Sequence, residues 1–156
     1  MNLHEGNLFF KHKHTTIDIE RMIDHFDSFD EFEKCFSDEL MNENLLLAEF
    51  LYKLLNEKGI SPSKVSEMIG ASPSYVRKIV NGDKLNPTRD ILLAICVYIG
   101  AYVEQTQILL RYAGKAPLYA RRKRDVIIWY ALKKNMRLAD VDEILIDKGF
   151  KELSKA

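Results

Sequence analysis

Apolar residues recur every three or four positions along most of the chain, which is the spacing of one face of an α-helix. The pattern begins near Thr16, and Ser28 with Glu31 opens a second helix in the capping pattern S-x-x-E. It then predicts helices over 44–58, 62–69, 73–81, 89–99 and 103–112, followed by a helical hairpin over 115–156. One face of the first helix is expected to carry Ile19, Met22, Ile23 and Phe26, and the second helix is expected to turn Phe29, Phe32, Phe36 and Leu40 inward. The pattern therefore predicts an all-α protein.

The stretch SPSKVSEMIGASPSYVRKIVNG, residues 61–82, predicts two short helices joined by a tight turn. Ser61 precedes Pro62 and Ser72 precedes Pro73, and both pairs are typical of a helix start, because Ser can cap and Pro lacks only an N–H that would be unpaired there. Gly70 allows a sharp exit from the first helix. Two helices joined by a short Gly-containing turn are the outline of a helix-turn-helix.

The spacing within this stretch is more specific than its outline. Ser66 is the small residue expected where the second helix crosses the first, and Val76 with Ile79 is the apolar pair that would hold the second helix. With the phrases GASPSYVRKIVNG and NPTRDILLAI, these residues resemble the lambda-repressor/Cro-like group of regulators, the xenobiotic-response-element (XRE) family. The alternative is a pair of amphipathic helices in an ordinary helical domain.

The resemblance implies three regions along the chain. Residues 44–114 would form a five-helix lambda-repressor-like DNA-binding domain. Residues 1–43 would be an acidic, Phe-rich and partly helical N-terminal arm, and residues 115–156 a C-terminal helical hairpin. The arm, over residues 16–43, is interpreted either as added core or as a docking element.

The C-terminal hairpin resembles a second copy of residues 89–118. At an offset of 35 residues identical residues coincide: Arg89 and Arg124, Asp90 and Asp125, Leu110 and Leu145, Gly114 and Gly149, Leu118 and Leu153. Trp129 and Tyr130 in this copy are candidates either for core or for a dimer surface.

Contacts to DNA are expected around the second helix of the helix-turn-helix. In the major groove its N-terminal half would face the bases, and Pro73 departs from the family pattern because it offers no donor. The candidate base-reading residues are Ser74, Tyr75, Arg77 and Lys78. The candidate phosphate-binding residues are Ser61, Ser63, Lys64, Ser72, Asn81, Lys84 and Arg89. Arg89 has the alternative of a helix-start role, since the Arg-Asp dipeptide recurs at Arg124.

Charge is balanced overall but unevenly distributed. The formal net charge is +0, with 23 Lys and Arg against 23 Asp and Glu. Residues 1–57 hold 5 basic against 13 acidic residues, and residues 58–156 hold 18 against 10, which is −8 and +8. An acidic arm attached to a basic body follows from this distribution. The basic run at 121–124 could flank DNA, pair with that arm or begin a solvated helix.

Several other classes of chemistry are not indicated. The chain has no Gly-rich phosphate loop, metalloprotease pattern or nucleophile triad in context, so we expect no enzyme activity and no cofactor. His12 and His14 form too sparse a set for a metal site, and no metal is expected. Cys35 and Cys96 are expected to be buried thiols, and the absence of a signal peptide or membrane span predicts a cytoplasmic protein.

The sequence thus predicts a bacterial or mobile-element transcriptional regulator that binds a double-stranded DNA operator sequence-specifically, with a recognition helix over about 73–81. The resemblance implies a homodimer, since operators of this family have two half-sites. A protein partner could bind through residues 16–43 or the C-terminal hairpin. The alternative is a protein-interaction module, antitoxin-like or an adaptor, that uses the helix-turn-helix scaffold without DNA.

Overall fold

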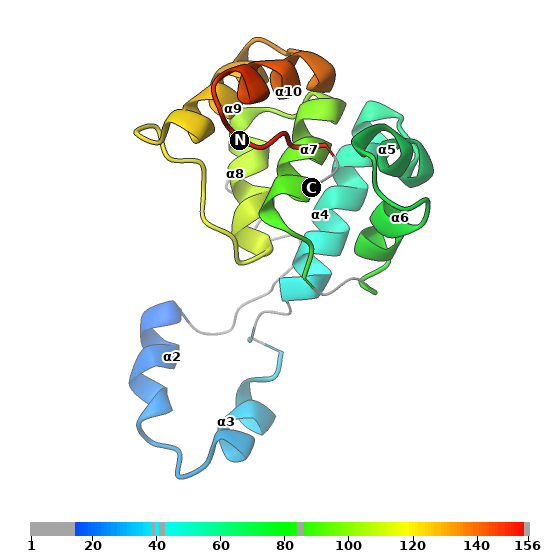
Figure 1. The fold of residues 1–156 in the computed structure, drawn as a ribbon. Helices are drawn as coiled ribbons and strands as arrows, with labels where there is room; N and C mark the ends of the chain where they lie inside the picture. Colours follow the sequence, from blue (N-terminus) through cyan, green and yellow to red (C-terminus); the bar gives the residue numbers. More distant parts are fainter. Residues whose placement is uncertain (1–14, 39, 41–42, 84–85, 155–156) are drawn as a thin grey trace. The chain divides into compact units, whose positions relative to one another are not determined.

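A computed structural model describes residues 15–38, 40, 43–83 and 86–154 (Figure 1). Every regular element in these ranges is an α-helix, which confirms the all-α prediction. The chain divides into two compact units, Met1–Asn42 and Glu43–Ala156. None of the described helices is both long and apolar enough to cross a membrane.

The first unit contains helices α2 (Thr16–Ile23) and α3 (Phe29–Phe36). Each begins at a hydroxyl cap: Thr15 Oγ1 accepts from the Asp18 N–H at 3.1 Å, and Ser28 Oγ accepts from the Glu31 N–H at 3.2 Å. The capping pattern predicted at Ser28 therefore forms at least in its N-cap half. Phe26, Phe32 and Phe36 gather in a small cluster, with ring centroids 4.9–5.9 Å apart.

Two predictions for this unit are wrong. Phe29 was expected to face inward but is 66% exposed, and Cys35 was expected to be buried but is exposed. Both lie on α3, whose buried residues are Phe32 and Phe36. Two short helices have only one shared internal face, so an apolar residue elsewhere on α3 remains in solvent.

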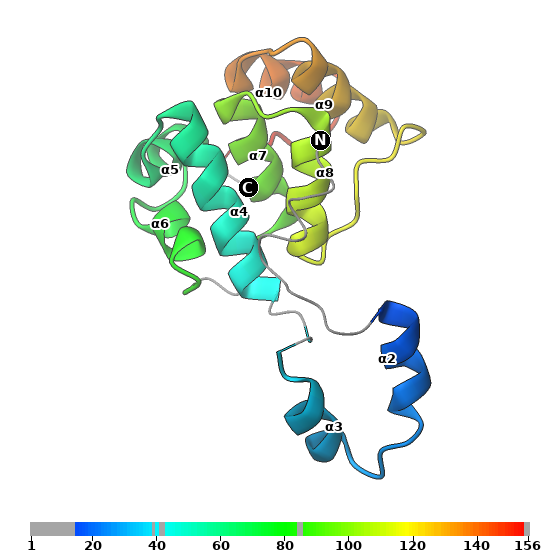
Figure 2. The same cartoon turned by 180° about the vertical axis from the view of Figure 1, so that it is seen from behind.

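The second unit contains seven helices in its described part. They are α4 (Glu43–Lys58), α5 (Pro62–Ile69), α6 (Tyr75–Val80), α7 (Arg89–Ile99), α8 (Val103–Tyr112), α9 (Lys123–Lys133) and α10 (Leu138–Asp147). Helix α7 lies at the centre, and seven of its residues are buried. Helices α7 and α8 form a first hairpin, and α9 and α10 form a second. Helix α4 packs against α8 and α5 against α7, while α9 and α10 pack against α7 (Figures 1 and 2). In both views α9 and α10 lie at the end of the unit away from α6.

The 35-residue repeat of the sequence is also a repeat of structure. Helix α9 corresponds to α7 and α10 to α8, and the pairs of helices pack reciprocally, α7 on α10 and α8 on α9. Gly100 ends α7 with φ +70°, and its counterpart Asn135 follows α9 with φ +52°. A positive φ is costly for residues with a side chain, and Asn tolerates it better than most, which explains the residue type at this position.

Hydrogen bonds repeat at the same offset. In the first copy, the Leu118 N–H donates to the side chain of Gln107 at 2.7 Å. In the second, the Leu153 N–H donates to the carboxylate of Asp142, 35 residues after Gln107, at 2.6 Å. Both leucines are buried. The segment after each hairpin is therefore fixed to its own second helix in the same way.

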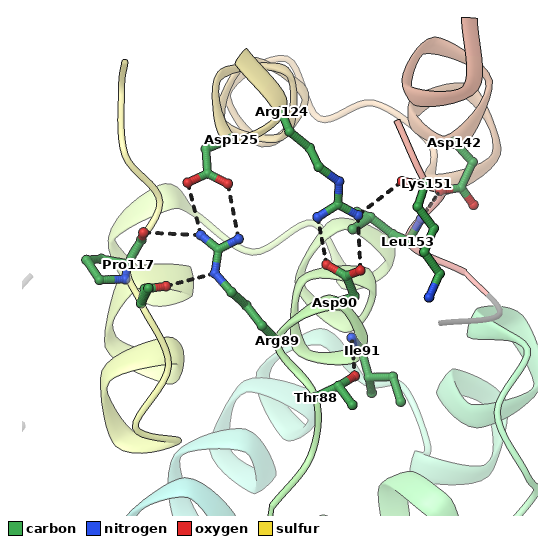
Figure 3. A network of polar contacts seen from close by, with 11 residues as sticks. Thr88, Arg89, Asp90, Ile91, Pro117, Arg124, Asp125, Asp142, Lys151 and Leu153 are labelled. Carbon is green, nitrogen blue, oxygen red and sulfur yellow. Dashed lines mark hydrogen bonds and ion pairs between the residues drawn. The ribbon is translucent and has the colours of Figure 1, made fainter. Parts of the chain in front are cut away.

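Two ion pairs cross between the copies (Figure 3). Arg89 donates to both carboxylate oxygens of Asp125, at 3.1 and 3.0 Å, and Arg124 donates to both oxygens of Asp90, at 2.7 and 3.1 Å. Each Arg also donates to a backbone carbonyl of its own copy: Arg89 to Ala116 O at 2.9 Å and Arg124 to Lys151 O at 3.0 Å. Charge-assisted, forked hydrogen bonds of this kind are strong and directional, so they fix the angle between the two hairpins.

Candidate nucleic-acid interface

The first helix of the helix-turn-helix, α5, begins as its sequence predicts. Ser61 Oγ accepts from the Lys64 N–H at 3.2 Å, and Pro62 occupies the first turn. Val65 and Ile69 are buried, at 0% and 3% exposure. The cap and the apolar stripe together fix where α5 starts and which face it turns to the core.

Gly70 ends α5 in the left-handed conformation, with φ +77° and ψ +19°. The following N–H, of Ala71, donates to Ser66 O at 2.9 Å, which closes the last turn of the helix. A side chain at Gly70 would make this backbone conformation costly. The predicted role of Gly70 as the turn residue is therefore confirmed.

The second helix, α6, is shorter than the predicted 73–81. It runs from Tyr75 to Val80, and Pro73 and Ser74 form a turn before it, closed by the Tyr75 N–H donating to Ser72 O at 3.0 Å. Ser74 has φ −97° and ψ 0°, outside the helical region, and makes no side-chain cap bond. Ser72 and Pro73 thus start a turn rather than the helix itself, because the backbone bends once more before the regular ladder begins.

One buried hydrogen bond joins the two helices. Ser66 Oγ accepts from the Val76 N–H at 3.0 Å, and both residues are 0% exposed. The N–H groups of a helix's first turn have no partner within that helix, so Ser66 satisfies a donor that would otherwise be buried and unpaired. Its position at the crossing agrees with the prediction, and Val76 and Ile79 hold α6 against the core as expected.

The outer side of α6 carries polar side chains. Arg77 and Lys78 are exposed, and Ser74 is half-buried in the turn just before the helix. Tyr75 is also half-buried, and burial raises the pKa of its phenol, opposed by a hydrogen bond with the backbone of Thr88. Arg77, Lys78 and Ser74 therefore lie together on one surface. The hydroxyl of Tyr75 instead forms a hydrogen bond with the backbone of Thr88, the residue before α7.

The predicted phosphate-binding residues divide into three groups. Ser61, Ser63, Lys64, Ser72 and Asn81 are exposed at the ends of α5 and α6. Lys64 pairs with Glu67 at 3.7 Å across a solvated helix face, which leaves its ammonium able to exchange partners at little cost. Lys84 lies outside the described residues.

Arg89 forms the third group by itself. Its side chain makes hydrogen bonds to the carbonyl oxygens of Ala116 and Pro117 in addition to the forked pair with Asp125. The Asp125 side chain is only 5% exposed, so withdrawing Arg89 would leave a buried carboxylate without its main partner. These contacts favour the helix-start alternative, and we do not include Arg89 among the proposed DNA contacts.

One hydrogen bond near the interface was not predicted. Lys115 Nζ donates to Asn86 Oδ1 at 2.7 Å and so connects the loop after α6 to the end of α8. The two residues are 29 positions apart, and although Asn86 opens the phrase NPTRDILLAI, nothing in that phrase indicates a partner at Lys115. A contact between two loops of this kind has no periodicity from which it could have been inferred.

Residues 51–104 match the family model described as Helix-turn-helix. The matched range contains α5, α6 and α7 entirely, together with part of α4 and the first residues of α8. Nothing matches the chain among curated proteins or among solved structures.

Proposed function

We propose that this chain, whose residues 51–104 are a helix-turn-helix of the XRE or lambda-repressor-like family, binds a double-stranded DNA operator sequence-specifically as a transcriptional regulator. The observation that carries the proposal is the buried bond between Ser66 and the Val76 N–H. It fixes α6 against α5 while Arg77 and Lys78 remain in solvent. A rigid helix that presents basic side chains outward is what entry into the major groove requires.

Base reading is assigned to the turn and first part of α6. Arg77 and Lys78 are suited to the O6 and N7 acceptors of guanine, and the hydroxyl of Ser74 can donate to or accept from a base edge. Tyr75 contributes the edge of its ring to a thymine methyl or the sugar, because its hydroxyl already bonds at Thr88. Pro73, which is exposed and has no N–H, adds only an apolar contact.

Phosphate binding is assigned to the groups around this helix pair. The exposed residues Ser61, Ser63 and Lys64 begin α5, where backbone N–H groups carry the positive end of the helix dipole. Ser72 and Asn81 stand at either end of the α6 segment, and Lys84 follows Asn81 three positions later in the sequence. Such contacts position the protein without reading sequence. Two copies of the chain on two half-sites complete the proposal.

The test begins with selection of bound sequences from random duplex DNA. Binding of the selected site is then measured over a salt series for wild type, Arg77→Ala and Lys78→Ala. Each substitution should weaken binding to the selected site by roughly 5- to 150-fold, equivalent to about 1–3 kcal/mol, and relax the preference at one base pair. Lys148→Ala, an exposed lysine just after α10, is the matched control and should bind as wild type does.

A second variant separates positioning from reading. Lys64→Ala should weaken binding about equally for all sequences and reduce the salt slope by about 1. If wild-type protein ignores DNA even at low salt, the regulator is ruled out and the protein-interaction module takes its place. If Arg77→Ala and Lys78→Ala bind as tightly as Lys148→Ala, DNA binding would have to use another surface.

A further inference from the structure

The two hairpins have equivalent contacts with each other but not with the rest of the chain. Helix α7 packs against α8, α9, α10 and also α5, and α8 packs against α7, α9 and also α4. Helix α9 packs against α7, α8 and α10, and α10 packs against α7 and α9. Helix α5 thus covers part of α7, and α4 covers part of α8. Among the helices of the described chain, none covers the corresponding parts of α9 and α10 in this way.

The side chains on α9 reflect this difference. Ala94 and Ile95 of α7 are both 0% exposed, whereas their counterparts on α9, Trp129 and Tyr130, are half-buried and 56% exposed. Val126, one helical turn earlier, is 42% exposed. These three residues, which we call the α9 face, form one apolar stripe at i, i+3 and i+4. At the 35-residue offset, Ile108 and Tyr112 of α8 correspond to two acidic residues of α10, Glu143 and Asp147. The exposed apolar stripe is therefore on α9.

Basic residues stand at both ends of the α9 face. Arg121, Arg122 and Lys123 are exposed at its start, and Lys133 and Lys134 at its end, where Lys134 Nζ lies 5.7 Å from the ring centroid of Tyr130. Two α9 faces packed on each other would bring like charges together in either direction. The charge pattern therefore disfavours self-pairing of α9 and favours an acidic, amphipathic helical partner.

The chain itself contains such a partner. Residues 15–40 hold nine acidic and two basic residues, and they form the two helices α2 and α3. Ile17, Ile23 and Phe29 of this segment are 59%, 52% and 66% exposed. The segment thus offers what a partner of the α9 face needs, namely apolar side chains on helices of opposite charge.

We propose that the α9 face binds the α2–α3 segment of a second copy of this chain. Reciprocal exchange gives two identical contacts related by a two-fold axis, which closes the assembly at a dimer. The inference rests on the homodimer that the proposed function requires, and it names the surface through which that dimer forms. Within the second unit α9 lies at the end away from α6, so a partner bound on α9 leaves the recognition helix of that copy uncovered (Figures 1 and 2).

The single tryptophan of the chain, Trp129, reports directly on this contact. The full chain, without DNA, is diluted from high to low concentration while sedimentation and the Trp129 emission maximum are followed. We expect a dimer whose Trp129 is shielded from acrylamide and a monomer whose emission is shifted to the red, with dissociation promoted by salt. Because no DNA is present, failure here leaves the test of the proposed function unaffected.

Variants of exposed residues identify the two sides without disturbing the fold. Tyr130→Ser and the double variant Ile17→Ser with Phe29→Ser should each raise the dimer dissociation constant at least about tenfold. Ile146→Ser, a change at an apolar residue on α10 that is 58% exposed, is the matched control and should leave it unchanged.

A charge exchange tests the pairing itself. Lys133→Glu with Lys134→Glu should dissociate the dimer, as should Glu20→Lys with Glu33→Lys, and combining all four substitutions should restore it. The proposal is overturned if the wild type is a monomer with exposed Trp129, or if the dimer survives every one of these variants. Shielding of Trp129 in a monomer would show that the segment binds within its own chain, and shielding that needs added DNA would show that the α9 face binds nucleic acid; either result overturns the second copy as the occupant.

Discussion

Replacing Arg89 by lysine should destabilise the protein much more than the same replacement at Arg124, although the two arginines occupy equivalent positions. Arg89 uses its whole guanidinium: Nε donates to Ala116 O, Nη2 to Pro117 O, and both Nη atoms to Asp125. Arg124 makes its forked pair with Asp90 and one bond to Lys151 O, while its Nε is buried with no partner in the described structure.

The magnitudes follow from counting what a lysine nitrogen can replace. At Arg89, the single lysine nitrogen keeps a contact with the carboxylate but reaches neither carbonyl, so two hydrogen bonds and the fork are lost, at about 1 kcal/mol each. The cost is therefore about 3 kcal/mol. At Arg124, one carbonyl bond and the fork are lost, but a buried unpaired N–H is removed, which returns about 1 kcal/mol. The net cost is about 1 kcal/mol, and the two variants should differ by about 2 kcal/mol.

Urea unfolding measures this difference directly. With m-values of about 1–3 kcal/mol/M, it corresponds to roughly 1 M between the two midpoints. Arg137→Lys is the control, because Arg137 is 83% exposed and solvent screens its pair with Asp140, so its midpoint should stay close to that of wild type. The reasoning is refuted if Arg124→Lys costs as much as Arg89→Lys while the m-values of the variants agree.

Three further outcomes are expected. Ser66→Ala removes the acceptor of a buried N–H and should lower the free energy of unfolding by about 1–3 kcal/mol; a variant as stable as wild type in urea would contradict the role given to this hydroxyl. Gly100→Ala should cost more than Gly114→Ala: both have positive φ, +70° and +66°, but only at Gly100 would the new Cβ lie 2.8 Å from Asn135 Oδ1. In an Asn135→Gly background this excess should vanish in thermal denaturation. Burial raises the pKa of Cys96 from its ordinary value of 9.0 to about 12, so above about pH 9 the unfolded chain loses a proton that the folded chain keeps. Stability should therefore fall with rising pH by up to about 1.4 kcal/mol per pH unit, and Cys96→Ala, compared by urea unfolding on both sides of pH 9, should lack this part of the slope.

The helix-turn-helix was predictable because local chemistry determines it. Ser61 and Pro62 start α5, Gly70 ends it, and Val76 with Ile79 orients α6; each acts through neighbours within a few residues. The start of α6 was misplaced by two residues because a serine before a proline is equally compatible with a helix start and with a turn. The sequence also predicted the repeat of the hairpin, since apolar spacing and glycines at a fixed offset are visible without coordinates.

What the sequence could not supply was the partner of each charged side chain. Arg89 and Asp90 are adjacent, and nothing in a dipeptide indicates that each binds across to the other copy rather than to solvent or DNA. Phe29 and Cys35 were misjudged for a related reason. Periodicity identifies an apolar face, but whether another element covers that face depends on how much structure surrounds the helix.

The crossed Arg–Asp pairs make each hairpin complementary to a copy of itself. Identical hairpins related by a two-fold axis would form both pairs at once, because Arg and Asp begin the first helix of each. A chain with a single such hairpin would therefore carry, in that dipeptide, the means to associate with a second copy of itself. Joining two such copies in one gene replaces an association that depends on concentration by a permanent one. The hairpin of α9 and α10 thus occupies the place that a second copy of α7 and α8 would take, and it packs against the half of the unit that carries α6.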